Sequence, residues 1–114
     1  MFASAVSAAY PYITHTVVMR PYVMENPENP EEGDPYIRIP GAPVQCTIDA
    51  TAGIQFVGME KPEILTFEIY DLSGACVAVF GDEDSFLDFL FAQSGEYQIR
   101  LVTANWAYVG YIGV

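Results

Sequence analysis

The stretch that decides the fold is ILTFEIYDLSGACVAVF, residues 64–80, in which two apolar runs flank four turn-forming residues. In the first run, apolar and polar residues alternate, as they do in a strand with one buried face. The residues expected to be buried are Leu65, Phe67 and Ile69. Asp71 can accept a backbone hydrogen bond, and Gly74 can adopt the positive φ that closes a tight turn. The stretch therefore predicts a β-hairpin whose polar residues turn the chain.

The same alternation recurs along the chain, and Gly, Pro, Asn or Asp interrupts it every 8 to 12 residues or so. With 114 residues, of which 52% are hydrophobic, the chain has the length and composition of one folded domain. Residues Phe86–Phe91 fit either a strand or a short helix, and the strand is favoured because a helix this short is unstable alone. The pattern predicts a single antiparallel immunoglobulin-like β-sandwich of about seven strands.

The sandwich is predicted to span residues 36–114, preceded by an N-terminal extension over residues 1–35. The extension contains a β-prone segment, residues 12–24, and the acidic, Pro-rich stretch ENPENPEEGD, residues 25–34. Pro11 and Pro21 would confine the segment to a sheet edge, because proline lacks the N–H that an interior strand donates. Such an edge could pair with a second copy, so a homodimer or an assembly by strand addition is one prediction.

Charge restricts the classes of partner. Fifteen acidic and four basic residues give a net charge of −11, which repels phosphate backbones and anionic membrane surfaces. The chain is therefore not expected to bind nucleic acid, and the uncharged first nineteen residues are broken by Pro11 and His15, so no transmembrane segment is expected. Residues Ser4–Ala9 either end a secretory signal or belong to the mature chain.

Residues able to do chemistry are few. Cys46 and Cys76 could form a disulfide in an exported protein, or remain two separate buried thiols. The only histidine, His15, is expected to be an ordinary strand residue, so the chain lacks a base for nucleophilic catalysis and is not predicted to be an enzyme. Asp82 and Asp84 could hold a weak Ca²⁺ site, although they lack the spacing of a full calcium loop.

Aromatic residues near the C-terminus are the candidate ligand-binding residues: Trp106, Tyr108 and Tyr111. Exposed rings of this kind can stack on sugars or on a protein partner. Alternation along the strand places Tyr108 and Tyr111 on opposite faces, so only one of them is expected to join the core.

Four segments follow one another in a recognisable order: Gly53–Phe56, Glu68–Gly74, Gly95–Tyr97 and Tyr108–Ile112. This order resembles a small secreted immunoglobulin-like domain family of unknown function from gut Gram-negative bacteria. More distantly, it is similar to the C-terminal sorting domains of type-nine secretion, although residues 108–114 carry none of the basic residues usual there. The resemblance implies an exported β-sandwich with no catalytic residues to carry over.

Together these observations predict a non-catalytic binding or adhesion-type accessory module that is secreted, periplasmic or at the cell surface. Its partner would be a protein or a glycan. The alternatives are a structural envelope component that assembles by strand addition or dimerisation, and a weak Ca²⁺-binding module. No other cofactor is expected.

Overall fold

The computed structural model describes residues 14–24, 36–38, 42–104 and 106–114. The stretches 4–9 and 25–34, for which the sequence predicts a signal remnant and an acidic loop, lie outside the described residues. The described chain forms eight strands and one helix: β1 (Thr14–Met24), β2 (Tyr36–Arg38), β3 (Val44–Asp49), β4 (Gly53–Phe56), β5 (Thr66–Tyr70), β6 (Cys76–Phe80), α2 (Glu83–Leu90), β7 (Glu96–Val102) and β8 (Trp106–Gly113).

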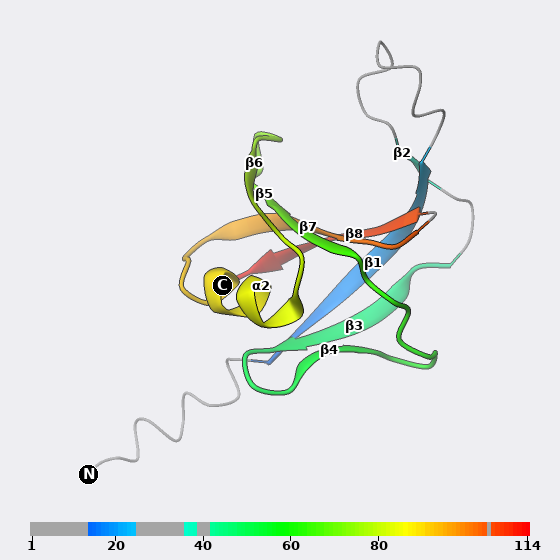
Figure 1. Cartoon of the computed structure of the whole chain (residues 1–114), viewed down its shortest axis with the longest axis horizontal. Helices are drawn as coiled ribbons and strands as arrows, with labels where there is room; N and C mark the ends of the chain where they lie inside the picture. Colours follow the sequence, from blue (N-terminus) through cyan, green and yellow to red (C-terminus); the bar gives the residue numbers. More distant parts are fainter. Residues whose placement is uncertain (1–13, 25–35, 39–41, 105) are drawn as a thin grey trace.

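All the strands belong to one antiparallel sheet. Its order is β4-β3-β1-β8-β7-β5-β6, with the short strand β2 pairing with β1 beside this path. The sheet curls, and α2 lies between the β5–β6 hairpin and the β3–β4 hairpin (Figure 1). The predicted antiparallel all-β domain of about seven strands is confirmed, and the two layers of the sandwich come from the two halves of one curled sheet.

The position of β1 corrects the predicted N-terminal extension. Residues 14–19 of β1 pair with β3 and residues 20–23 pair with β8, so β1 lies inside the sheet and the predicted edge position is wrong. Pro21 is tolerated there because it lies between Met19, the last residue paired with β3, and Tyr22, the first residue paired with β2. The folded unit therefore includes β1.

The turn between β5 and β6 forms as the sequence predicts. The carboxylate Oδ1 of Asp71 accepts hydrogen bonds from the backbone N–H groups of Ser73 at 2.9 Å and Ala75 at 3.0 Å. Gly74 has φ 95°, a conformation that disfavours residues with a Cβ. The Ser73 hydroxyl also donates to Asp71, and this bond contributes most to lowering the pKa of Asp71, with the backbone bonds adding to it. The prediction that the Asp71 side chain turns the chain is confirmed.

The segment predicted as a strand after β6 is the helix α2, so that prediction is wrong. Asp82 caps the helix by accepting a 2.8 Å hydrogen bond from the backbone N–H of Ser85, and two acids occupy the first turn. The helix buries Phe86 against Phe67, with ring centroids 5.4 Å apart, and sets Phe89 beside Phe80 at 5.5 Å. Tertiary packing thus stabilises a helix that is too short to persist alone.

The core fills the space between the sheet and α2. Its buried members are Val17, Met19, Cys46, Ile48, Ile54, Phe56, Phe67, Ile69, Phe86, Leu87, Leu90, Ile99, Leu101, Tyr108 and Ile112. Phe67 and Ile69 are buried as predicted, whereas Leu65 is 48% exposed. Leu65 comes just before β5 begins, so its side chain does not follow the alternation of that strand.

Candidate functional site

The three aromatic residues singled out in the sequence do not form one surface. Tyr108 is buried and packs edge-on against Phe56 at 5.3 Å, and Trp106 meets the same Tyr108 ring at 6.4 Å. Tyr111 is 63% exposed on the other face of β8. The prediction that Tyr108 and Tyr111 point to opposite faces is confirmed, and Trp106 borders a small pocket.

A small pocket lies beside Trp106, where the segment preceding β5 meets the connection between β7 and β8. It has a volume of about 170 Å³ and is lined by Pro62, Glu63, Leu65, Thr103, Ala104 and Trp106. Pockets that enclose a drug-sized ligand measure roughly 300–1,000 Å³. The pocket at Trp106 is therefore the size of one apolar side chain or ring.

Hydrogen bonds from Thr103 hold the backbone of Trp106 in place. The backbone N–H and the hydroxyl of Thr103 donate to the carbonyl oxygen of Trp106 at 2.8 and 2.9 Å, and the hydroxyl accepts from the Trp106 N–H at 3.3 Å. The indole Nε1–H of Trp106 is buried and has no hydrogen-bond partner among the described residues. A buried donor left without an acceptor typically costs about 1–3 kcal/mol.

The exposed Tyr111 belongs to a row of polar side chains that crosses β8, β7 and β5. The Tyr111 hydroxyl accepts from Gln98 Nε2 at 3.0 Å, and Gln98 Oε1 accepts from Arg100 Nε at 2.9 Å. The Arg100 guanidinium lies 4.2 Å from the centre of the Tyr70 ring, and the Tyr70 hydroxyl donates to Glu68 at 2.8 Å. Burial, together with this bond to Glu68, raises the pKa of Tyr70.

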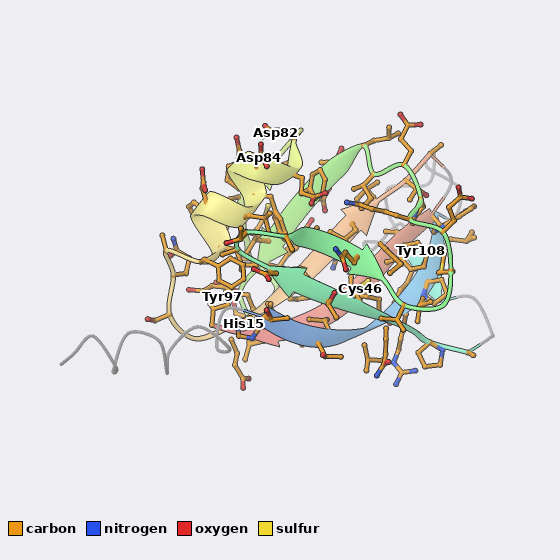
Figure 2. All side chains as sticks on the ribbon, turned by 90° about the horizontal axis from the view of Figure 1, so that it is seen from below. His15, Cys46, Asp82, Asp84, Tyr97 and Tyr108 are labelled. Atoms are coloured by element: carbon orange, nitrogen blue, oxygen red, sulfur yellow. The ribbon has the colours of Figure 1, made fainter. Side chains whose placement is uncertain are left out.

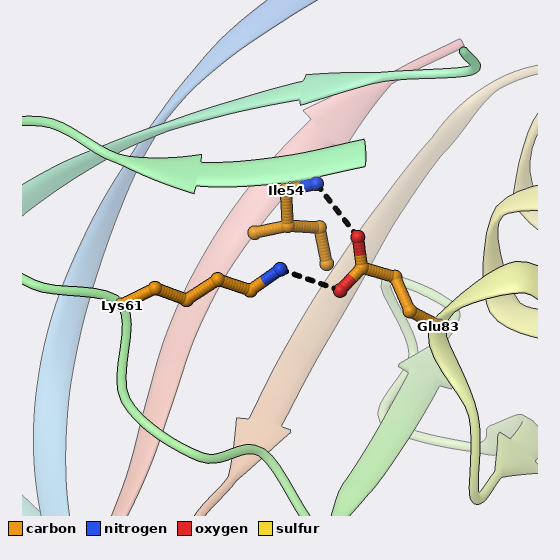
Figure 3. A network of polar contacts seen from close by, with 3 residues as sticks. All are labelled: Ile54, Lys61 and Glu83. Carbon is orange, nitrogen blue, oxygen red and sulfur yellow. Dashed lines mark hydrogen bonds and ion pairs between the residues drawn. The ribbon is translucent and has the colours of Figure 1, made fainter. Parts of the chain in front are cut away.

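The two edge strands of the sheet, β4 and β6, differ in whether their outward-facing backbone groups have partners. At β4, the backbone N–H of Ile54 donates to Glu83 Oε2 of α2 at 2.9 Å, and the other carboxylate oxygen pairs with Lys61 Nζ at 2.7 Å (Figure 3). The first turn of α2 thus covers an outward-facing donor of the edge strand. Sequence analysis did not identify Glu83, because its partner Ile54 lies 29 residues away.

The other end of the sheet, β6, is open. It pairs only with β5 among the described strands, and Cys76, Val77 and Val79 on it are exposed. The pairing with β5 shifts register between Ile69 and Tyr70, which leaves Val77 as the extra residue of a bulge. An open edge with exposed valines is a template for a further strand.

The two cysteines do not pair, so the structure contradicts the disulfide and agrees with the alternative of two separate thiols. Both thiols are free, with Cys46 buried under β1 and β4 and Cys76 exposed on the edge strand β6. Burial raises the pKa of the Cys46 thiol to about 12, an effect that the positive charge of Lys61 partly offsets. Cys46 is therefore an unreactive core residue.

The remaining candidate residues have structural roles. Asp82 caps α2, and Asp84 lies beside it at the start of the helix, on the outside of the molecule (Figure 2). The described residues contain no group of three or more His, Cys, Asp or Glu side chains that could hold a metal ion. His15 is a half-buried strand residue, as expected, and its ring lies 5.6 Å from that of Phe91.

Comparison with known proteins adds no relative: no family model matches the chain, and no curated protein or solved structure matches it significantly. None of the described helices is long and apolar enough to span a membrane. The pocket at Trp106 and the open β6 edge are therefore the features of this chain from which a function can be argued.

Proposed function

We propose that the protein is a non-catalytic binding module that recognises a protein partner through the pocket at Trp106. The observation that carries this proposal is an apolar pocket whose wall includes a partly exposed leucine, Leu65, and an indole whose buried N–H has no acceptor among the described residues. The pocket accepts one apolar side chain. A carbonyl oxygen next to that side chain would satisfy the indole N–H after a small displacement of the pocket wall.

The setting of the pocket supports binding more than catalysis. Thr103 anchors the Trp106 backbone through three hydrogen bonds, so little freedom is lost when a partner docks. Three of the described carboxylates have structural roles, Asp71 in a turn, Asp82 in a helix cap and Glu83 at the β4 edge. We place the module outside the cytoplasm, in the envelope or the medium, on the sequence argument for export.

The experiment uses the fact that Trp106 is the only tryptophan, so its fluorescence reports on this site alone. Arrays of synthetic peptides and of glycans are probed with the intact protein, and hits are titrated while the emission of Trp106 is followed. We expect peptides with an exposed apolar residue to bind and to shift the emission. Leu65→Ala should weaken binding by about tenfold, since it removes most of one wall of the pocket.

Leu72→Ala is the matched control, because Leu72 is 60% exposed but lies in the turn between β5 and β6. Trp106→Phe keeps an aromatic ring and removes the N–H, so it should also weaken binding. Binding that tolerates both Leu65→Ala and Trp106→Phe would rule the pocket out. A glycan as the only hit would replace the proposed class of partner.

A further inference from the structure

We infer that the β6 edge is a second docking site, which accepts an extended segment of a partner protein with Lys or Arg at its ends. The inference starts from the contrast between the two ends of the sheet. Glu83 covers the Ile54 N–H on β4, whereas nothing in the described part of the chain pairs with the outer edge of β6. One end thus has a capped donor, and the other is left open.

The side chains at the open end favour an apolar contact. Val79 is 54% exposed and Val77 is 41% exposed, and the stretch Ala75–Phe80 contains no charged residue. Natural edge strands are usually protected by lysine, proline or a covering segment. Here the edge strand has five residues and a bulge at Val77, and the bulge leaves residues 78–80 regular, which suits a short added strand.

Charge defines the kind of segment that fits. Asp71 lies in the turn before β6, and Asp82 and Asp84 follow the strand, so both ends of the edge are acidic. An added strand would gain main-chain hydrogen bonds along its length, and basic residues at its two ends would meet these carboxylates. Apolar residues at alternating positions would extend the surface of Val77 and Val79.

A second copy of the chain fits this edge poorly. Antiparallel pairing of two β6 strands would place the Asp71 end of one beside the Asp82 end of the other, and each copy carries a net charge of −11. Like charges brought together in this way oppose association. The partner is therefore a basic, extended segment of a different protein.

The test uses a fluorescein-labelled peptide, Lys-Val-Thr-Val-Thr-Val-Lys, and the intact protein at low salt with a reducing agent present. Fluorescence anisotropy measures binding, and hydrogen exchange reports on the β6 amides. We expect the peptide to bind and to slow exchange at Cys76–Phe80. Replacing its terminal lysines by glutamates, or methylating alternate backbone nitrogens, should weaken binding by about tenfold or more, because these changes remove the charge match and the main-chain bonds respectively.

Protein variants separate the edge from the rest of the surface. Val79→Lys should weaken binding by about tenfold or more, because it places a lysine on the docking edge. Val18→Lys is the matched control, since Val18 is 47% exposed on the interior strand β1, and it should bind like the unmodified protein. Leu65→Ala, which tests the Trp106 pocket, should also leave this affinity unchanged.

Three results would overturn the inference. They are equal binding of the N-methylated peptide, equal loss in Val79→Lys and Val18→Lys, and no binding of the basic peptide even at low salt. Sedimentation covers the remaining case: a dimer that dissociates in Val79→Lys would assign the edge to a second copy and so contradict the basic partner.

Discussion

Replacing Gly110 by alanine tests how closely β8 approaches β1, the contact that curls the sheet. Gly110 is buried, and a Cβ added to it would lie 2.5 Å from the sulfur of Met19 and 2.8 Å from Cγ1 of Val17. It would also lie 2.8 Å from the backbone carbonyl oxygen of Val18. The Met19 side chain can move away, but the carbonyl belongs to backbone that is paired with β3 at Gln45.

The magnitude follows from these contacts. Packing an extra carbon into a full core costs about 1–3 kcal/mol, while exchange of glycine for alanine recovers about 0.4–1 kcal/mol by restricting the unfolded chain. We therefore expect Gly110→Ala to lower the free energy of unfolding by about 1–2 kcal/mol. For a domain of this size, that lowers the Tm by roughly 4–15 °C.

Urea unfolding followed by Trp106 fluorescence measures the change, and Gly113→Ala is the matched control. Gly113 lies on the same strand but is exposed, and the nearest atom to an added Cβ is Glu96 Cγ at 3.7 Å, an ordinary contact. The control should change stability by less than about 0.5 kcal/mol. Equal stabilities of Gly110→Ala and Gly113→Ala would show that β8 and β1 do not meet as described.

Two further predictions concern Glu83 and the cysteines. Glu83→Ala should lower the free energy of unfolding by about 1–3 kcal/mol, because it leaves a partly buried N–H without an acceptor. Glu83→Gln keeps an acceptor and should lower it by less than about 1 kcal/mol. Asp84→Ala, the exposed control in the same helical turn, should change it little, and urea unfolding measures all three. A thiol reagent should label Cys76 rapidly and Cys46 only on unfolding, as intact mass would show; labelling of both in the folded protein would contradict the burial of Cys46. Burial raises the pKa of the Cys46 thiol above its value in the unfolded chain. The contribution of Cys46 to stability is therefore intact below about pH 8.5 and falls as the pH rises toward about 12, by up to about 1.4 kcal/mol per pH unit. Cys46→Ala should lack this contribution to the pH dependence.

Local patterns in the sequence were sufficient to predict the β5–β6 hairpin and its turn. The alternation through Phe67 and Ile69, and the pairing of Asp71 with Gly74 in a turn, depend on residues a few positions apart. Backbone geometry imposes a period of two on any strand with one buried face, and few residues accept a positive φ. These features therefore follow from the order of the amino acids alone.

Tertiary structure decided the features that depend on distant residues. β1 lies inside the sheet because it pairs with β3 and with β8, whose Val109 is 89 positions from its partner Arg20, 109 minus 20. The helix α2 persists because Phe67 and Phe80 pack against it. No local pattern contains such contacts, since their free energy arises only when the partners meet.

The same division holds for the candidate sites. Sequence alone selected Trp106, because a lone tryptophan near a predicted hairpin is a natural contact residue, but it also selected Tyr108, which the fold buries. The pocket at Trp106 and the contrast between the capped β4 and the open β6 depend on which segments the curled sheet brings together. Residue type limits the chemistry that a side chain can take part in. Long-range packing sets the burial and the neighbours of each side chain, and so decides which side chains can contact a partner.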